Sequence, residues 1–245
     1  MQTRLDIYLY EQKMVKSRSA AAEMIKSGSI SVNGSVITKP SFTVNDGDSV
    51  FITGEVLKYV GRGGLKLEKA IDFFSIDLSG RTCLDIGAST GGFTDCMLQN
   101  GAKLVYAVDV GTDQLDEKLR ADSRVISMEK TDIRNVGDSI PAVDFISIDV
   151  SFISLKLVLP SAKAHLKRGG CAVALIKPQF EAGKASLNKK GVVRDEKIRN
   201  RICSEISDFA ASIGFTVGNI IISPITGGDG NTEYLIYLLN EGELI

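Results

Sequence analysis

Residues 83–95 read CLDIGASTGGFTD, and this stretch decides the expected fold of most of the chain. The apolar run that ends at Ile86 is typical of a buried strand, and a helix is expected to begin at the glycine pair Gly91–Gly92. Gly87 lies in the turn between them, and a glycine-containing turn from strand to helix is where an open α/β sheet binds its ligand. The spacing is not G-x-G-x-x-G and lacks the GK[ST] ending of a P-loop, which disfavours dinucleotide and nucleoside-triphosphate binding.

On both sides of this turn, strands are expected to alternate with helices, including helices that begin near Leu65 and Gly91. The expected strands cover residues 82–86, 104–108, 124–127, 145–149, 172–176, 217–222 and 234–239. Too little chain separates the last two strands for a crossover helix, so they should form an antiparallel hairpin at one sheet edge. The predicted fold class is α/β and Rossmann-like, with a mainly parallel sheet.

The first part of the chain follows a different pattern, which predicts a small α+β domain. Residues 4–27 are expected to form two short helices, the second capped by Ser17 or Ser19. Alternating apolar residues around Asn33-Gly34 predict a β-hairpin over 30–37, and 50–53 is a further expected strand. Four glycines fall within residues 54–64, which is typical of a linker. The predicted division is a domain over 1–58, a linker over 59–64 and the α/β domain over 65–245.

Composition narrows the class of protein. The chain of 245 residues has 44% hydrophobic and 24% charged residues and a net charge of -1. No apolar run reaches the roughly 18 residues that span a bilayer, and the charged N-terminus does not resemble a secretory signal, so we expect a cytoplasmic protein without a membrane partner. Four widely spaced cysteines without CxxC spacing predict free buried thiols and no metal site.

Three carboxylates lie at the ends of expected strands: Asp85 just before the first glycine, Asp109 at the end of the next strand and Asp132 after the third. Carboxylates favour a cationic sulfonium and its ribose hydroxyls over a pyrophosphate, which they would repel, so the predicted ligand is S-adenosylmethionine. Asp109 is expected at the ribose and Asp132 near the adenine amino group. Each residue alone could instead be a helix cap or turn residue. The expected cofactor contacts are Asp85, Gly87, Ala88, Ser89, Gly91, Gly92, Asp109 and Asp132.

Motifs along nearly the whole chain resemble a known family. RLDIYL (4–9) and SRSAAAEMIKSGSISVNG (17–34) resemble the RNA-binding domain named after ribosomal protein S-four. The rest is similar to the TlyA family of rRNA 2′-O-methyltransferases, historically labelled haemolysin A, and to the FtsJ-type ribose methyltransferases. The motifs that carry this second resemblance are YVGRGGLKL (59–67), LDIGASTGGFTDC (84–96), YAVDVG (106–111), IDVSFISL (148–155), IKPQFE (176–181), GVVRD (191–195) and SPITGGDGNTEYL (223–235).

The resemblance implies 2′-O-methylation of cytidine ribose in bacterial ribosomal RNA, with ribosomal RNA or a ribosomal subunit as partner. Only three residues precede RLD, which is similar to members that modify the large subunit alone. Matching the family's Lys-Asp-Lys-Glu set onto this sequence gives the catalytic residues Lys66, Asp149, Lys177 and Glu233. A lysine can accept the hydroxyl proton only in its neutral form; Lys177 is one candidate, and the sequence leaves the acceptor open.

Other acceptors and activities are less compatible with the residues. Base amino methylation commonly uses Asn/Asp-Pro-Pro-aromatic, where this chain has Asp149-Val-Ser-Phe152, and no cysteine follows a proline as carbon methylation of pyrimidines would require. Two further classes stay open. One is a catalytically silent RNA-binding assembly factor, and the other is a membrane-lytic haemolysin.

Basic residues concentrate in two places, the N-terminal helices and the segment from Lys177 to Arg201, which has eight basic and three acidic residues. Either could be an ordinary solvated surface. Beside a catalytic domain, they favour phosphate contacts, and we expect Lys184–Arg201 to be a mobile loop and helix start that clamps RNA. The expected RNA contacts are Arg4, Lys16, Arg18, Arg62, Lys189, Lys190 and Arg194.

Overall fold

The computed structural model describes residues 2–52, 58–183, 186–227 and 230–241. Contacts divide the chain into two compact units, Met1–Lys58 and Tyr59–Ile245, which are described separately below. Within the described ranges, no helix is both long and apolar enough to cross a membrane.

The N-terminal unit contains the two expected helices, α1 (Leu5–Glu11) and α2 (Arg18–Lys26). Ser17 is the residue that caps α2, because its hydroxyl accepts a hydrogen bond from the backbone N–H of Ala20 at 3.1 Å. The expected hairpin and third strand form the sheet β3 (Ser35–Val36), β2 (Ile30–Val32) and β5 (Val50–Ile52). A second sheet, β1 (Gln2–Arg4) with β4 (Thr43–Asn45), was not anticipated from the sequence, because three-residue strands carry almost no periodic signal.

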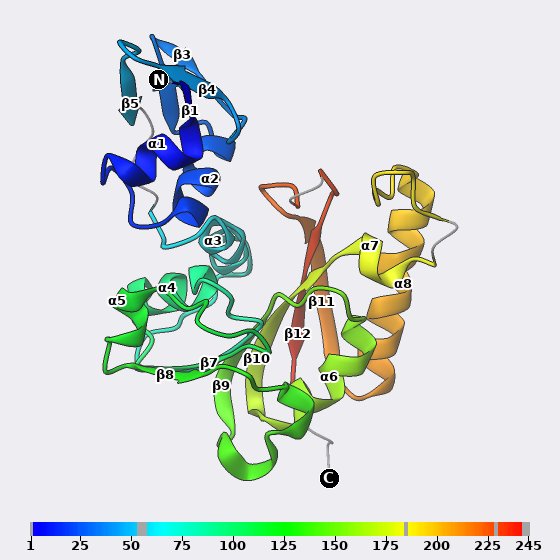
Figure 1. Cartoon of the computed structure of the whole chain (residues 1–245). Coiled ribbons are helices and arrows are strands. Elements are labelled where there is room, and N and C mark those ends of the chain that lie inside the picture. The colour runs from blue at the N-terminus through cyan, green and yellow to red at the C-terminus, as the bar shows by residue number, and fades with distance from the viewer. Residues whose placement is uncertain (1, 53–57, 184–185, 228–229, 242–245) are drawn as a thin grey trace. The chain divides into compact units, whose positions relative to one another are not determined.

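The C-terminal unit is built on a seven-stranded sheet of order β11-β12-β10-β9-β6-β7-β8 (Figure 1). The pairs β10–β9, β9–β6, β6–β7 and β7–β8 are parallel, whereas β12 is antiparallel to both β10 and β11. The predicted α/β class and the antiparallel edge hairpin are therefore confirmed. The strands are β6 (Thr82–Ile86), β7 (Leu104–Val108), β8 (Val125–Met128), β9 (Val143–Ile148), β10 (Leu166–Ile176), β11 (Thr216–Ile222) and β12 (Tyr234–Leu239).

Successive side chains along a strand point to opposite faces of the sheet. Both faces are apolar here, and helices cover each of them. In β9, Ile146 and Ile148 join the cluster under α6 and α8, while Phe145 joins the cluster under α3 and α4. Figure 1 shows these two pairs of helices on opposite sides of the sheet. The helices are α3 (Gly63–Phe74), α4 (Gly92–Gln99), α5 (Glu117–Arg120), α6 (Leu155–Ala164), α7 (Pro178–Glu181) and α8 (Glu196–Ser212), with 3-10 turns at Ile133–Asn135 (η1) and Gly137–Ser139 (η2).

The expected linker over 59–64 is instead packed into the C-terminal unit. Tyr59 is buried in the cluster under α3 and α4, and the N–H of Val60 donates to Asp95 Oδ2 at 2.8 Å. A Cβ at Gly61 would lie 2.7 Å from Thr90 Oγ1, and one at Gly92 would lie 3.0 Å from the backbone nitrogen of Gly64. The glycines of this segment and Gly92 permit close backbone packing, whereas the glycines of residues 54–64 had indicated a linker.

Candidate active site

Four charged side chains from distant parts of the chain meet at one edge of the sheet. Asp149 directly follows β9 and Lys177 directly follows β10, so both stand at carboxyl ends of neighbouring parallel strands. Glu233 directly precedes β12, which runs antiparallel to β10 and therefore begins at the same edge. Lys66 lies near the start of α3. We call these four residues the charged tetrad.

The tetrad forms a chain of alternating charges in which Asp149 is shared by both lysines. Lys66 Nζ donates to Glu233 Oε2 at 2.7 Å and lies 3.8 Å from Asp149 Oδ2. Lys177 Nζ lies 2.5 Å from Asp149 Oδ1 and donates to Ser151 Oγ at 2.9 Å. The Lys177–Asp149 contact is an ion pair without hydrogen-bond alignment, since Oδ1 is buried and has no aligned donor among the described residues. Oδ1 can thus accept a hydrogen bond from a bound hydroxyl.

Burial makes the tetrad geometry rigid. Lys66, Lys177 and Glu233 expose only 8%, 8% and 3% of their surface. A buried charge is tolerated only with close partners, and removing one partner of such a pair costs about 3–5 kcal/mol. Two cations and two anions balance each other here. The four side chains are therefore held in fixed positions with no net charge among them.

The glycine turn after β6 lies directly against the tetrad. Gly87 and Gly91 have φ of +86° and +95°, conformations that favour glycine. A Cβ at Gly87 would come within 2.5 Å of the carbonyl oxygen of Asp149, and the N–H of Asp149 donates to the carbonyl of Ile86 at 2.9 Å. A ligand seated in this turn would therefore lie beside Asp149.

Asp109 is the one expected cofactor carboxylate that the structure places at this turn. It follows β7, and its Oδ2 accepts a hydrogen bond from the N–H of Ser89 at 2.8 Å. Its Oδ1 accepts from the N–H of Gly111 at 2.7 Å. Each carboxylate oxygen has a second lone pair, so Asp109 can still accept hydrogen bonds from two ligand hydroxyls.

Asp85, which the sequence predicts as a cofactor contact, has a fully buried side chain. Its side chain is 0% exposed and accepts hydrogen bonds from Thr94 Oγ1 at 2.7 Å and Ser147 Oγ at 2.9 Å. Burial raises the pKa of this carboxyl to about 7, although both hydroxyl donors lower it. Asp85 joins α4 and β9 to β6 beneath the turn and acts on the turn only through this packing.

Asp132 follows the alternative that the sequence analysis left open, that of a helix cap. Its carboxylate accepts a hydrogen bond from the N–H of Arg134 at the start of η1 at 3.0 Å and pairs with the Arg134 guanidinium at 2.6 Å. The hydrogen bond from the Arg134 side chain lowers the pKa of Asp132. The expected adenine contact would therefore have to compete with Arg134.

Phe152 is a feature of the site that the sequence analysis did not identify. Its side chain is 90% exposed, it has a φ of +64°, and its ring centroid lies 4.9 Å from that of Phe180. Lys177 Nζ lies 5.9 Å from the ring centroid of Phe180. A bulky residue at positive φ is unusual and is often found at functional sites. The pair offers a base an aromatic stacking surface beside Lys177. Its sequence signal was only an aromatic residue three positions after Asp149.

Two of the expected RNA contacts of the N-terminal unit, Arg4 and Arg18, lie at one carboxylate. Arg4 donates two hydrogen bonds to Asp6, at 3.0 and 2.9 Å, and Arg18 lies 3.6 Å from the same side chain. These contacts lower the pKa of Asp6. Arg4, Lys16 and Arg18 remain exposed to solvent. We call Arg4, Asp6 and Arg18 the surface cluster.

The remaining basic residues lie in the C-terminal unit. Arg62 is partly buried at the start of α3, whereas Lys189, Lys190 and Arg194 are exposed. Asn231 fastens the loop that carries these three residues, since its side chain bonds the N–H of Val193 and the carbonyl of Gly191, both at 3.1 Å. These two hydrogen bonds join the centre of the loop to the segment before β12, and its expected mobility without RNA stays a prediction. Lys184, at the start of that segment, lies outside the described residues.

Comparisons with known families match both units. A model described as FtsJ-like methyltransferase matches residues 59–239, and a model described as S4 domain matches residues 3–50. The chain is 39% identical over 238 residues to the 16S/23S rRNA (cytidine-2′-O)-methyltransferase TlyA of Mycobacterium tuberculosis, covering 96% of this chain and 89% of that protein. It is 43% identical over 241 residues to Hemolysin A of Brachyspira hyodysenteriae, covering 96% and 99%.

Solved structures agree with the observed fold. A candidate hemolysin from Streptococcus thermophilus is 47% identical, with a TM-score of 0.77 over 97% of this chain and 88% of that one. An S-adenosylmethionine-dependent methyltransferase from Mesorhizobium loti is 13% identical, with a TM-score of 0.51 over 69% and 95%. The second likeness shows the fold alone. In this chain, the charged tetrad lies at the carboxyl edge of the sheet of that fold.

Proposed function

We propose that this chain methylates a cytidine ribose 2′-hydroxyl in ribosomal RNA, because it belongs to the FtsJ-like methyltransferase family and carries an S4 domain. The contact of Gly87 with Asp149 carries the proposal. It puts the glycine turn, where the methyl donor is expected, directly beside a buried tetrad of the Lys-Asp-Lys-Glu type. The cytidine substrate follows the named activity of the Mycobacterium tuberculosis relative.

The residues of the turn fit S-adenosylmethionine as the methyl donor. Gly87 and Gly91 leave the turn without side chains where a ligand must approach the backbone, and Asp109 has free acceptor capacity for the two ribose hydroxyls. The sulfonium of S-adenosylmethionine supplies an electrophilic methyl group. Asp149 stands against the turn, so the acceptor hydroxyl held by the tetrad would meet that methyl group without a long displacement.

The tetrad supplies what a ribose hydroxyl lacks, which is fixed orientation and a route for its proton. Lys66 is held between Glu233 and Asp149, and we assign to it the orientation of the ribose. The hydroxyl proton leaves as the oxygen–methyl bond forms and the methyl–sulfur bond breaks. Asp149 or a neutral Lys177 accepts it, because Asp149 Oδ1 has no aligned donor among the described residues and Lys177 Nζ lies beside it.

The S4 domain would supply RNA affinity without taking part in the chemistry. Its exposed Arg4, Lys16 and Arg18 can contact phosphates. We propose the large ribosomal subunit as target, because a relative 33% identical over 258 residues is named as the 23S rRNA (cytidine-2′-O)-methyltransferase TlyA of Campylobacter jejuni. The alternative of a catalytically silent assembly factor predicts binding without methyl transfer.

The test is methyl transfer from radiolabelled S-adenosylmethionine to isolated large and small ribosomal subunits. A 2′-O-methyl group blocks alkaline cleavage at its own nucleotide, which maps the product. Lys177→Ala should abolish incorporation. Lys69→Ala, which removes an exposed lysine on α3, should leave it unchanged and serves as the matched control. Full RNA binding without incorporation into either subunit would instead support the silent assembly factor.

A further inference from the structure

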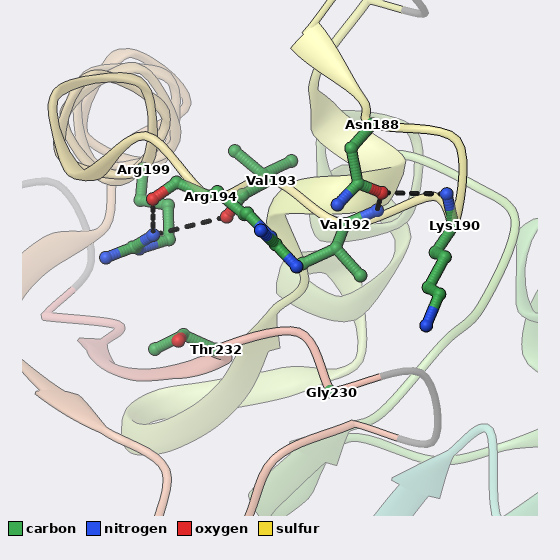
Figure 2. A pocket seen from close by; sticks show the side chains of 8 residues that line it. All are labelled: Asn188, Lys190, Val192, Val193, Arg194, Arg199, Gly230 and Thr232. Atoms are coloured by element: carbon green, nitrogen blue, oxygen red, sulfur yellow. Dashed lines mark hydrogen bonds between the residues drawn. The ribbon is translucent and has the colours of Figure 1, made fainter.

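A polar cavity of about 320 Å³ lies between two loops of the C-terminal unit (Figure 2). One loop precedes α8 and contributes Asn188, Lys190 and Arg194, and the other precedes β12 and contributes Gly230 and Thr232. Arg199, in the first turns of α8, completes the wall. Three cations and no carboxylate line the described part of this cavity, so it favours an anion.

The cationic side chains are arranged for a ligand between the loops. Figure 2 shows the side chains of Lys190 and Arg194 extending from the first loop toward the second, where Gly230 and Thr232 lie. Arg199 is fixed by hydrogen bonds from its Nε to the Tyr234 hydroxyl at 3.0 Å and from its Nη1 to the Arg194 carbonyl at 2.6 Å. These bonds use neither proton of its Nη2. An arginine held in this way loses little side-chain entropy when an anion binds.

The loop backbone is also preformed. Asn188 Oδ1 accepts hydrogen bonds from the N–H groups of Lys190 and Val192, at 2.8 and 3.0 Å. Asn231 is only 1% exposed, and it bonds this loop to the neighbouring one through Gly191 and Val193. Its own neighbours in the chain are Gly230 and Thr232, both in the cavity wall. Because these hydrogen bonds fix the loop backbone, the cationic residues of the cavity wall start from defined positions.

The cavity adjoins the charged tetrad along the chain on both sides. Thr232 is the residue before Glu233, so their Cα atoms are about 3.8 Å apart. The other loop follows α7, which begins immediately after Lys177. One wall therefore adjoins Glu233 directly, and the other belongs to the connection that leaves the sheet at Lys177.

We propose that this cavity binds a backbone phosphodiester of the RNA strand, next to the ribose that the tetrad receives. The inference rests on the proposed function, because it takes the RNA strand at the tetrad as given. Lys190 and Arg194 contact the phosphate oxygens, and Arg199 offers Nη2 from the cavity wall. The wall has no aromatic side chain on which a base could stack, which favours the backbone over a free nucleotide.

A pair of charge-matched double variants tests the assignment in the full chain. K190A/R194A removes two cavity cations, and K197A/R201A removes two exposed cations of the same segment that do not line the cavity. Affinity for a ribosomal RNA fragment is measured across salt concentrations. We expect about tenfold weaker binding for K190A/R194A and a log–log salt slope flattened by about 1.4. K197A/R201A should change both much less. Equal losses of RNA affinity in the two double variants would contradict phosphodiester binding in the cavity, and general charge attraction would explain the result.

A neutral methylphosphonate, placed in turn at each linkage flanking the target nucleotide, identifies the phosphodiester. One position should weaken binding to the wild-type chain and have no further effect on K190A/R194A. Additive losses at every position would overturn the assignment. Inorganic phosphate forms the second arm: saturable phosphate binding that RNA does not displace would identify a free anion as the ligand. These readouts are of binding, so they stay distinct from a failure of the proposed function, which would appear as absent methyl transfer.

Discussion

The charged tetrad and the surface cluster contain the same kinds of groups but differ in burial. In the tetrad, Lys66 and Glu233 are separated by 167 positions and are almost fully enclosed. In the surface cluster, Arg4 and Asp6 are two positions apart; the Asp6 side chain is only 7% exposed, but that of Arg4 is 51% exposed, so solvent reaches the pair from the arginine side. Buried ion pairs have strong mutual dependence, whereas exposed ones are screened by water and salt. The tetrad can therefore fix a reacting group in place, and the surface cluster can exchange partners.

The largest expected effect comes from breaking the tetrad. Lys66→Met leaves Glu233 and Asp149 without their shared cation and should destabilise the chain by about 3–5 kcal/mol. Methyl transfer should fall by about a thousandfold or more. Urea unfolding and single-turnover methylation measure the two losses. In the double variant K66M/E233Q most of the stability should return and activity should not; recovered activity would remove Lys66 from the chemistry.

A large effect on pH dependence is expected from Asp85, the other buried charge in this unit. Its pKa is raised to about 7, so between about pH 4 and 7 the folded state holds a proton that the unfolded chain releases. The stability contributed by this proton is complete at low pH and is lost as the pH rises through about 7.

Urea unfolding of the wild-type chain and of Asp85→Asn over this pH range measures that contribution. The difference in unfolding free energy should change by a few kcal/mol at most. Asp132→Asn is the matched control that should show no change over this range, because the lowered pKa of Asp132 contributes stability that is lost only as the pH falls below about 4. Parallel pH profiles for wild type and Asp85→Asn would show that Asp85 does not titrate in this window.

A smaller effect is expected at Asp109, which is only partly buried. Asp109→Ala removes the acceptor from the turn and should weaken S-adenosylmethionine binding by roughly 1–3 kcal/mol, the usual cost of leaving ligand hydroxyls unpaired. Isothermal titration calorimetry gives the affinity directly. Asp113→Ala, an exposed carboxylate of the following loop, is the control. Unchanged affinity in Asp109→Ala would take this residue out of the cofactor site.

The smallest effect on folding is expected in the surface cluster. Replacing Arg4 and Arg18 with glutamine should lower the urea midpoint only modestly, because both arginines are about half exposed and water partly screens their pairs with the buried Asp6. RNA binding should weaken, and the salt slope should flatten by about 0.7 for each lost contact with single-stranded RNA. A clear drop in stability without any change in RNA affinity would show that the surface cluster, like the tetrad, stabilises the fold and does not bind RNA.

Local sequence signals predicted the elements of the fold well because they depend on neighbouring residues. The apolar run ending at Ile86, the glycine turn and the short connection before β12 each carry information within a few positions. The same local logic failed for residues 59–64. Glycine permits both a flexible linker and close backbone packing, and only the contacts with Thr90 and Asp95 distinguish the two.

The sequence by itself determined the α/β architecture, the antiparallel edge strands and, through a family resemblance, the four residues of the tetrad. The tertiary structure alone decided where side chains point. It turned Asp85 inward to Thr94 and Ser147, and it joined the loop of Arg194 to that of Thr232 through Asn231. Elements follow from interactions over a few residues, whereas a side chain's direction depends on packing between segments far apart in the chain. For that reason the chemistry of this edge of the sheet could be named from the sequence, while its geometry could not.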